Sequence, residues 1–482
     1  MGSLGWFEAH DYEIARQVLQ RGVAALACVA FLSTLNQFRA LLGERGLLPV
    51  PELLERASRL RGPSVFRWGY TDRRLVMVAI TGLALGASVV LGLPQSGPPW
   101  VPMLVFLALW ILYLSIVNVG QTFYGFGWEM LLCEALFTVA FLGSNGEPPP
   151  IAIVVLVWWL VFRLEFGAGM IKIRGGREWR DLTALSYHHE TQPMPGPFSR
   201  QAHLLPGWFH RCEVLGNHIA QLVVPFLLFV PGPVGSAAAA IVILTQLWLI
   251  ATGNFAWLNW ITVVLAAAAI SDPVWHAVIP AIPADLGTDA TTIPIGWLVV
   301  VLAVSALLVV LSVQPIRNLF SRRQLMNASF NRWMLVNAYG AFGTVTKRRI
   351  EIVVEGTLDK KPGEDAEWRE YEFKGKPGDP RRLPRQWAPY HLRLDWLMWF
   401  LPLGRIGEPW FAMFLVRLLQ ADAATLRLLL VDPFDGGRPS WVRARSYHYR
   451  FATRAEYRAS GARWIRTPQR IVVPPSALRR EG

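Results

Sequence analysis

The residues best suited to chemistry stand together in one short run, Tyr187, His188, His189 and Glu190. Their side chains can donate, accept and carry protons near neutral pH, as general acid-base catalysis requires. His188, His189 and Glu190 are therefore candidates for a catalytic acid or base. Neighbouring residues point apart in most backbone geometries, so a second interpretation, in which the run braces its loop through hydrogen bonds, stays equally open.

Cationic residues precede this run. Lys172, Arg174 and Arg180 follow directly on an apolar segment. Because the arginine fork fits phosphate and carboxylate, an anionic lipid headgroup is a natural ligand for them. The competing interpretation is an interfacial loop, in which Trp179 anchors at the headgroup level and the cations extend to the membrane surface.

The sequence offers no recognisable metal site. His203, His210 and His218 are the histidines that could add ligands to the pair at 188–189, but no spacing of the H-E-x-x-H kind joins them. The three cysteines form no C-x-x-C motif, and no glycine or serine pattern of nucleotide-binding or hydrolase sites occurs in a suitable setting. We expect neither a metal nor a cofactor.

The composition indicates a membrane protein. Of the 482 residues, 53% are hydrophobic and only 17% are charged, which is more apolar than an ordinary soluble domain. Lysine and arginine outnumber the acidic residues by 47 to 34, which gives a net charge of +13. These cations flank apolar stretches instead of forming one basic groove, so they favour contact with the lipid bilayer over nucleic acid.

A membrane span takes about 20 mostly apolar helical residues, because its backbone groups must be satisfied internally. Two acidic residues, Glu129 and Glu134, fall in one apolar stretch, and Arg163 and Glu165 fall in another, where charge is costly unless it is paired. We predict a polytopic α-helical bundle of seven to nine spans over residues 1–313, with the first, fourth and eighth candidates the weakest. The nine candidates are 18–38, 74–94, 99–118, 128–144, 150–171, 213–231, 236–253, 256–271 and 293–313.

Three hydrophilic stretches leave this bundle, at 40–73, 172–211 and 314–482. An even number of candidates separates them when all nine are counted, so they are expected on one side of the membrane. The short loops of the other side are neutral or acidic, and the positive-inside rule then makes the side with the three stretches cytoplasmic. One miscounted segment would separate them.

Residues 314–482 are predicted to form a small β-rich (α+β) soluble domain. Apolar and polar residues alternate with the period of a strand in 349–357 and 368–373, and turn residues between them predict a hairpin. Two further strands are expected at 441–451 and 470–474. The apolar stretches 391–404 and 408–420 are short for spans, so helices packed on the sheet or lying at the membrane interface are predicted.

The run G-x-x-K-I-R-G-x-x-x-W-R-D-L-T at 169–183, followed by H-x-E-T-Q-P-M-P at 188–195, resembles the signature of the lipase maturation factor family. The stretches 330–357, 393–400 and 441–451 resemble that family's carboxyl-terminal domain, in the same order. The resemblance implies a membrane-anchored, chaperone-like factor, more than an enzyme, that assists the maturation of secreted lipases or similar hydrolases. The arginine-rich chain, with no retention signal at its RREG end, fits a bacterial member of the plasma membrane, whereas animal members belong to the endoplasmic reticulum membrane.

The resemblance also singles out residues. The family motif makes the segment 172–211 a functional loop, whose candidate residues are Lys172, Arg174, Gly175, Trp179, Arg180, Asp181, Tyr187, Glu190, Gln192 and Pro193. Six aromatic residues of the predicted strands could hold an unfinished client or could instead form the core of the sheet: Trp368, Tyr371, Phe373, Trp441, Tyr447 and Tyr449.

Two questions stay open at this level. The alternative function is a membrane enzyme that acts on a lipid or anionic substrate at the loop 172–200. Two predictions for the side of the carboxyl-terminal domain also conflict. A secreted client requires this domain in the lumen or outside the cell, whereas the arginine bias predicts the cytoplasm. Long domains translocate largely regardless of charge, so the family-based expectation is favoured.

Overall fold

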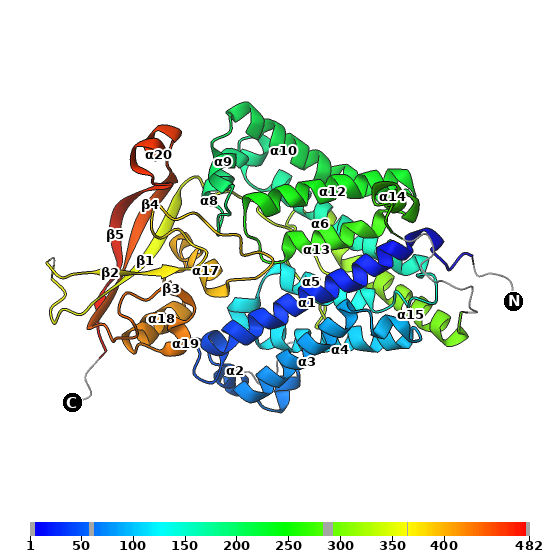
Figure 1. Ribbon diagram of the computed structural model, residues 1–482, viewed down its shortest axis with the longest axis horizontal. Coiled ribbons are helices and arrows are strands. Elements are labelled where there is room, and N and C mark those ends of the chain that lie inside the picture. The colour runs from blue at the N-terminus through cyan, green and yellow to red at the C-terminus, as the bar shows by residue number, and fades with distance from the viewer. Residues whose placement is uncertain (1–4, 57–61, 283–292, 364, 479–482) are drawn as a thin grey trace.

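The computed structural model describes residues 5–56, 62–282, 293–363 and 365–478, and Figure 1 shows a helical bundle joined at one end to a sheet. Among the described helices, six have the length and apolar composition of a membrane span. These are α1 (Glu13–Leu42), α3 (Asp72–Val90), α4 (Trp100–Val119), α6 (Ile151–Arg174), α12 (Pro233–Thr252), and α15 (Ile295–Leu311) with its continuation α16 (Val313–Phe320).

The other three predicted spans are shorter helices. They are α5 (Gly127–Val139), α10 (Gly207–Leu222) with α11 (Val224–Leu227), and α13 (Leu258–Ala266), which forms a bent pair of 113° with α14 (Asp272–Val278). The described helices thus provide six spans, or seven if the bent pair counts as one, so the predicted range of seven to nine is slightly high. Hydropathy overestimates the count because each of these apolar stretches is divided by a helix end or a bend, so none forms one helix of span length.

The first candidate span is stronger than the sequence suggested. Its terminal polar residues, including Gln37, argued against it, yet α1 is the longest helix of the described bundle. Gln37 donates to the carbonyl of His391 at 2.6 Å and accepts from the amide of Arg393 at 3.0 Å. The polar end of α1 therefore lies against the carboxyl-terminal part of the chain and is paired there.

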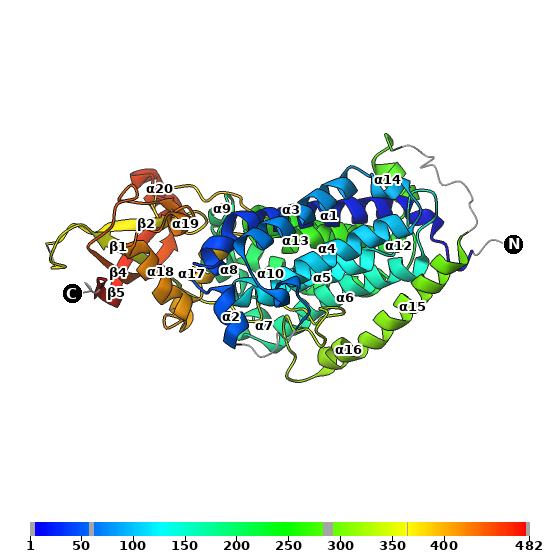
Figure 2. The same cartoon turned by 90° about the horizontal axis from the view of Figure 1, so that it is seen from below.

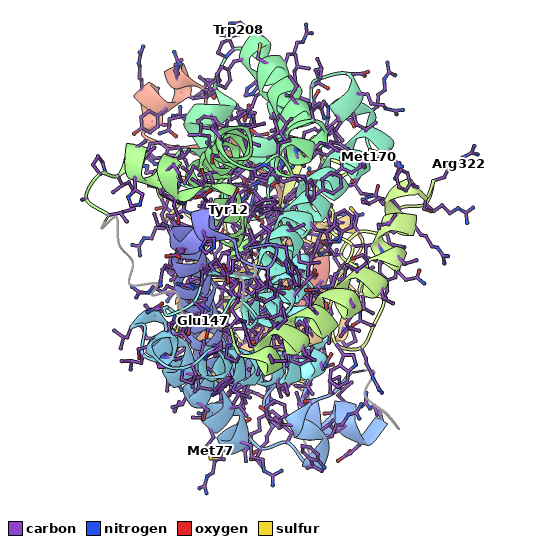
Figure 3. All side chains as sticks on the ribbon, turned by 90° about the vertical axis from the view of Figure 1, so that its right-hand side faces the viewer. Tyr12, Met77, Glu147, Met170, Trp208 and Arg322 are labelled. Atoms are coloured by element: carbon purple, nitrogen blue, oxygen red, sulfur yellow. The ribbon has the colours of Figure 1, made fainter. Side chains whose placement is uncertain are left out.

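The chain alternates between two ends of the bundle. At the end away from the sheet, the amide of Glu13 donates to the carboxylate of Asp272, and the amide of Gly232 donates to the hydroxyl of Tyr12. Figure 3 looks along the bundle from this end: Tyr12 and Glu147 lie among the helices, while Met77 and Trp208 point outward at opposite edges of the bundle. Exposed apolar side chains on the flanks suit a lipid environment.

The opposite end gathers the three hydrophilic stretches. Arg417 of the carboxyl-terminal part donates to the carbonyl of Arg45 at 2.8 Å, and Arg200 donates to that of Ala452 at 2.9 Å. Figure 2 shows α2 and the loop helices at the same end of the bundle as the sheet. Their bounds are α2 (Val50–Arg56), α7 (Arg177–Arg180), α8 (Leu185–Thr191) and α9 (Ser199–His203). The shorter helices α5 and α10–α11 also run between the two ends, since Gly143 after α5 accepts from Gln20 and Gly232 after α11 donates to Tyr12. For this reason the three stretches come to the same end, as expected, although fewer than nine described helices have the length of a span.

The carboxyl-terminal part holds a five-stranded antiparallel sheet in the order β3-β2-β1-β4-β5. Its strands are β1 (Arg349–Thr357), β2 (Arg369–Phe373), β3 (Leu429–Val431), β4 (Trp441–Phe451) and β5 (Trp464–Ser476). The four predicted strands are present, whereas β3 is too short to show a period. The helices are α17 (Arg393–Met398), α18 (Pro409–Leu419), α19 (Ala423–Leu426) and α20 (Arg454–Ser460). Phe414 of α18 packs 6.0 Å from the ring of Phe373, so this helix covers the sheet as predicted.

A fully buried ion pair ties α17 to the bundle. Nη1 of Arg393 lies 2.5 Å from Oε1 of Glu129, and neither side chain is exposed. The same Nη1 donates to the carbonyl of Phe123 at 2.8 Å, and the guanidinium stacks 3.4 Å from the ring centre of Tyr124. The acidic residue that weakened the fourth candidate span is therefore neutralised by a residue far along the chain.

A second buried pair fixes the segment that leads from α16 to the sheet. Glu134 pairs with Arg163, accepts from the amide of Asn337 at 2.9 Å and accepts from the hydroxyl of Tyr339 at 2.7 Å. Arg163 donates in turn to the carbonyl of Asn337 at 2.7 Å. Because both charges are costly in an apolar bundle, this arrangement keeps residues 337–339 against α5 and α6.

Replacing Arg393 by Met should destabilise the protein strongly. The Glu129 carboxylate would stay buried without its cation, which costs about 3–5 kcal/mol. The thermal unfolding midpoint of the purified protein in detergent should fall, as followed by intrinsic fluorescence, and the double variant Glu129→Gln/Arg393→Met should recover part of the loss. Arg56→Met is the matched control, since its pair with Glu52 is exposed. Equal midpoints for Arg393→Met and Arg56→Met would contradict the role of the pair.

Candidate functional site

A cavity of about 790 Å³ lies where α6, α10, α12 and α13 meet residues 172–211, the motif loop, and the carboxyl-terminal part. This volume is within the range of pockets that enclose a small molecule. Its lining is mainly aromatic and aliphatic, and both the bundle and the carboxyl-terminal part contribute large rings: Trp128, Trp248, Phe255, Trp396, Trp399 and Phe400. The cavity therefore offers an apolar space that is shared by the two parts of the chain.

One wall of the cavity is polar. Nζ of Lys172 donates to Oε1 of Gln221 at 2.8 Å, and Nε2 of Gln221 donates to Oε2 of Glu165 at 3.0 Å. Gln246 donates to the other oxygen of Glu165 at 2.8 Å, and the ammonium lies 4.7 Å from the ring centre of Trp179. The charges of Lys172 and Glu165 are thus linked through amides, so an occupant would meet a neutral polar wall.

The start of the motif loop is packed against residues 342–343. The indole of Trp179 donates to the carbonyl of Phe342 at 2.7 Å. Gly175 approaches the backbone of Gly343 so closely that a Cβ would lie 2.1 Å from its carbonyl oxygen. A side chain at Gly175 would require the two segments to separate, which explains glycine at this position of the motif.

The charged residues of the loop do not converge on one point. Nη1 of Arg174 donates to Oε1 of Gln324 at 2.7 Å, whereas Arg180 is exposed. Asp181 is exposed as well and pairs with Arg177 at 2.8 Å. The predicted cluster for an anionic headgroup is therefore not assembled by these arginines in this structure.

A buried arginine of β1 holds the end of the motif. Nη1 of Arg349 donates to the carbonyls of Glu190 at 2.9 Å and Gln192 at 2.5 Å, and Nη2 donates to that of Pro193 at 3.1 Å. Arg349 also pairs with Glu351 at 2.6 Å, and its side chain is fully buried. One guanidinium thus ties the sheet to three motif residues, and the sequence reasoning missed it.

Side chains of the motif also hold the loop against the sheet and the bundle. Oε2 of Glu190 accepts from the amide of Phe451 at 2.8 Å, and burial raises the pKa of the Glu190 carboxyl above its usual value. Nε2 of Gln192 donates to the carbonyl of Thr252 at 2.7 Å, at the end of α12. These contacts support the interpretation in which the run braces its loop.

His188 faces the cavity. Its ring stacks on Phe255 with centres 6.0 Å apart and planes at 8°, and it contacts Phe342 edge to face. Burial lowers the pKa of His188 to about 3, so this residue is neutral at pH 7 and does not titrate near neutrality as the sequence suggested. Tyr187, next to it, lies half-buried beside the ammonium of Lys347.

His189 points to a different partner. Its Nε2 lies 3.2 Å and 3.3 Å from the two oxygens of Glu213, and Nδ1 of His210 lies 3.4 Å from Oε2 of the same carboxylate. Trp248 donates to Oε1 of Glu213 at 2.6 Å. Glu213 escaped the sequence reasoning, although an H-x-x-E spacing on one helix places His210 and Glu213 on the same face and could have indicated it.

Four of the six strand aromatics are core residues. Tyr371, Phe373, Tyr447 and Tyr449 are buried in the sheet domain, so they offer no surface to a client in this structure. Trp368 is half-buried under the guanidinium of Arg443, 3.9 Å away. Tyr371 and Phe373 belong to the main core, whereas Tyr447 and Tyr449 lie on the other face of the sheet in a smaller cluster with Trp464. The core interpretation thus applies to these four.

Comparison with known proteins matches the chain along most of its length. The lipase maturation factor transmembrane domain matches residues 14–277, and the lipase maturation factor C-terminal domain matches residues 335–474. Lipase maturation factor 1 of Bos taurus is 38% identical over 97% of this chain and 90% of its own length, and that of Homo sapiens is 37% identical over 99% and 90%. Lipase maturation factor 2 of Gallus gallus is 28% identical over 94% and 79%. No solved structure matches the chain.

Replacing Arg349 by Lys should loosen the motif loop without removing the charge. An ammonium cannot reach the three carbonyls that the guanidinium fork serves, and a hydrogen bond from a charged group contributes about 1.5–3 kcal/mol. Amide hydrogen exchange at 188–192 should accelerate about ten-fold or more. Arg348→Lys, at the exposed neighbour, is the control and should leave exchange unchanged. Unaltered exchange in both variants would show that Arg349 does not hold the loop.

Proposed function

The chain belongs to the lipase maturation factor family, and from this premise we propose that it helps a secreted lipase, or a similar exported hydrolase, to reach its active fold at the membrane. The observation that carries the proposal is the match of both family domains, in order, to one multi-pass membrane chain. Buried contacts such as Arg393 with Glu129 join the two domains. The factor therefore acts as one unit anchored in the bilayer.

We place the contact with the client at the cavity and not at the strand aromatics. An unfinished client exposes apolar side chains, and the cavity presents large rings from both domains, such as Trp128 and Trp399. The motif loop forms part of the same wall through Lys172 and His188. This location gives the motif a role in shaping the binding surface.

We further propose that the end with the sheet faces the lumen of the endoplasmic reticulum, or the outside of the cell in a bacterium. A secreted client can be met only there. The three hydrophilic stretches occur at this one end, so they share one sidedness. The arginine bias argues for the cytoplasm, but long domains escape the positive-inside rule.

The enzyme alternative ranks second. A membrane enzyme acting on a lipid or anionic substrate would use Arg174 and Arg180 to hold the anion, yet the first is bonded to Gln324 and the second is exposed. His188 is buried among aromatic rings and neutral at pH 7. These placements favour a structural part for the loop.

Rescue of a secreted lipase tests the proposed function. In cells that lack their own family member, co-expression of this chain should restore the secreted lipase activity. Trp399→Ala, which removes a ring from the cavity, should reduce the rescue several-fold, whereas Trp208→Ala, on the outer surface of α10, should not. Absence of rescue by the intact, membrane-inserted chain would refute the function for that lipase.

A reporter fused after residue 482 tests the sidedness. A reporter that folds only in the lumen or outside the cell should be active, and one that is active only in the cytoplasm should be silent. A second pair of fusions within 92–99, at the other end of the bundle, should give the reverse pattern. Cytoplasmic activity at residue 482 would place the sheet away from any secreted client and overturn the proposal.

A further inference from the structure

Three side chains from two helices meet beside the cavity. His189 is on α8, while His210 and Glu213 are on α10, and one ligand atom from each lies within 4.8 Å of the others. Both histidines are almost completely buried, with exposed fractions of 1% and 3%. Two imidazoles and a carboxylate are the donor set of many three-residue metal sites, for which zinc is the most usual ion.

The distances between these atoms are longer than those of strong hydrogen bonds. A charged N–H donor usually lies about 2.7–2.9 Å from a carboxylate oxygen. Here Nε2 of His189 and Nδ1 of His210 lie 3.3 Å and 3.4 Å from Oε2 of Glu213. Two ligands of a tetrahedral zinc ion with bonds of about 2.0–2.1 Å are separated by about 3.3 Å. These two separations match the edge of a zinc coordination tetrahedron, and all three ligand atoms lie within 4.8 Å of one another.

The contacts of the two nitrogens of His210 also favour a metal site. Its Nε2 faces the carbonyl of His203 at 3.3 Å, and its Nδ1 faces Glu213. When Nε2–H is bonded to this carbonyl, the lone pair of Nδ1 is directed toward Glu213, where a metal ion could accept it. A backbone carbonyl on the far nitrogen is the usual way in which proteins orient a metal-binding imidazole.

The carboxylate is held in the required orientation from outside the cluster. Trp248 of α12 donates to Oε1 of Glu213 at 2.6 Å, which leaves Oε2 for the two histidines. Nδ1 of His189 makes no hydrogen bond to the described residues, so this ring is directed by its Nε2 alone. Nearby His218, bonded to the carbonyl of Trp179, is engaged elsewhere.

We propose that His189, His210 and Glu213 bind a divalent transition-metal ion, with zinc the expected one. The ion would connect α8 of the motif loop to α10. Because Glu213 also lines the cavity, the fourth position would open toward it and be taken by water or by an anionic group of an occupant. This proposal differs from the expectation of no metal that the sequence spacing gave. The proposal stands on this geometry and does not depend on the proposed function.

The metal content of the full chain, purified in detergent without chelator, is the direct test. Mass spectrometry should find about one zinc ion per chain in the wild type. His210→Ala and His189→Ala should each lower the bound zinc about ten-fold or more. His276→Ala, at the other end of the bundle, should keep it. Equal zinc content in the wild type and His210→Ala would overturn the site.

Cobalt provides a test that needs no variant. The wild type is stripped with chelator and titrated with Co²⁺, which should produce the visible absorption of a tetrahedral site and raise the thermal unfolding midpoint. Zinc should displace the cobalt and remove the absorption. A stripped but folded chain that binds neither cobalt nor zinc would refute the proposal, whether or not the chain rescues a lipase.

Discussion

Charge buried in an apolar bundle must find its opposite, and this constraint organises the molecule. Glu129 and Glu134 of α5 are paired with Arg393 and Arg163, and each pair is completed by further hydrogen bonds. Removing one partner of such a pair is far more costly than removing both. The pairs therefore do more than neutralise charge, since they dictate which distant segments must lie together.

A backbone interaction extends the same principle to the motif. Arg349 pairs with Glu351 of its own strand and donates to three backbone carbonyls of the loop, at Glu190, Gln192 and Pro193. Because these carbonyls all accept from one guanidinium, the backbone of the loop must keep its conformation regardless of its side chains. The rigidity of the cavity wall thus depends on a residue of the sheet, and the proposed metal site would hold the same loop from its other face.

Local sequence patterns predicted the helices and strands, but they could not predict which distant residues pair with the buried charges. Hydropathy located the long helices, alternation located two strands and β-propensity located two more, because these signals are contained within one segment. The strand β3, with three residues, is too short to carry a period. Glu129 was recognisable as anomalous in a span, but Arg393 is 264 residues away, and nothing in the sequence joins them. Glu213 went unnoticed for a related reason, since its partner His189 belongs to another helix.

The sequence separation of Glu129 from Arg393 also means that the two residues are synthesised at different times. Ribosomes add about 5–20 residues per second, so roughly 15–50 s pass between the synthesis of the two partners. Throughout that interval α5 holds a carboxyl group whose final cation does not yet exist. The bundle can close only after translation is nearly finished, and the nascent chain must rely on water, the insertion machinery or another chaperone to shelter that group. A factor that assists the folding of others thus has a vulnerable assembly step of its own.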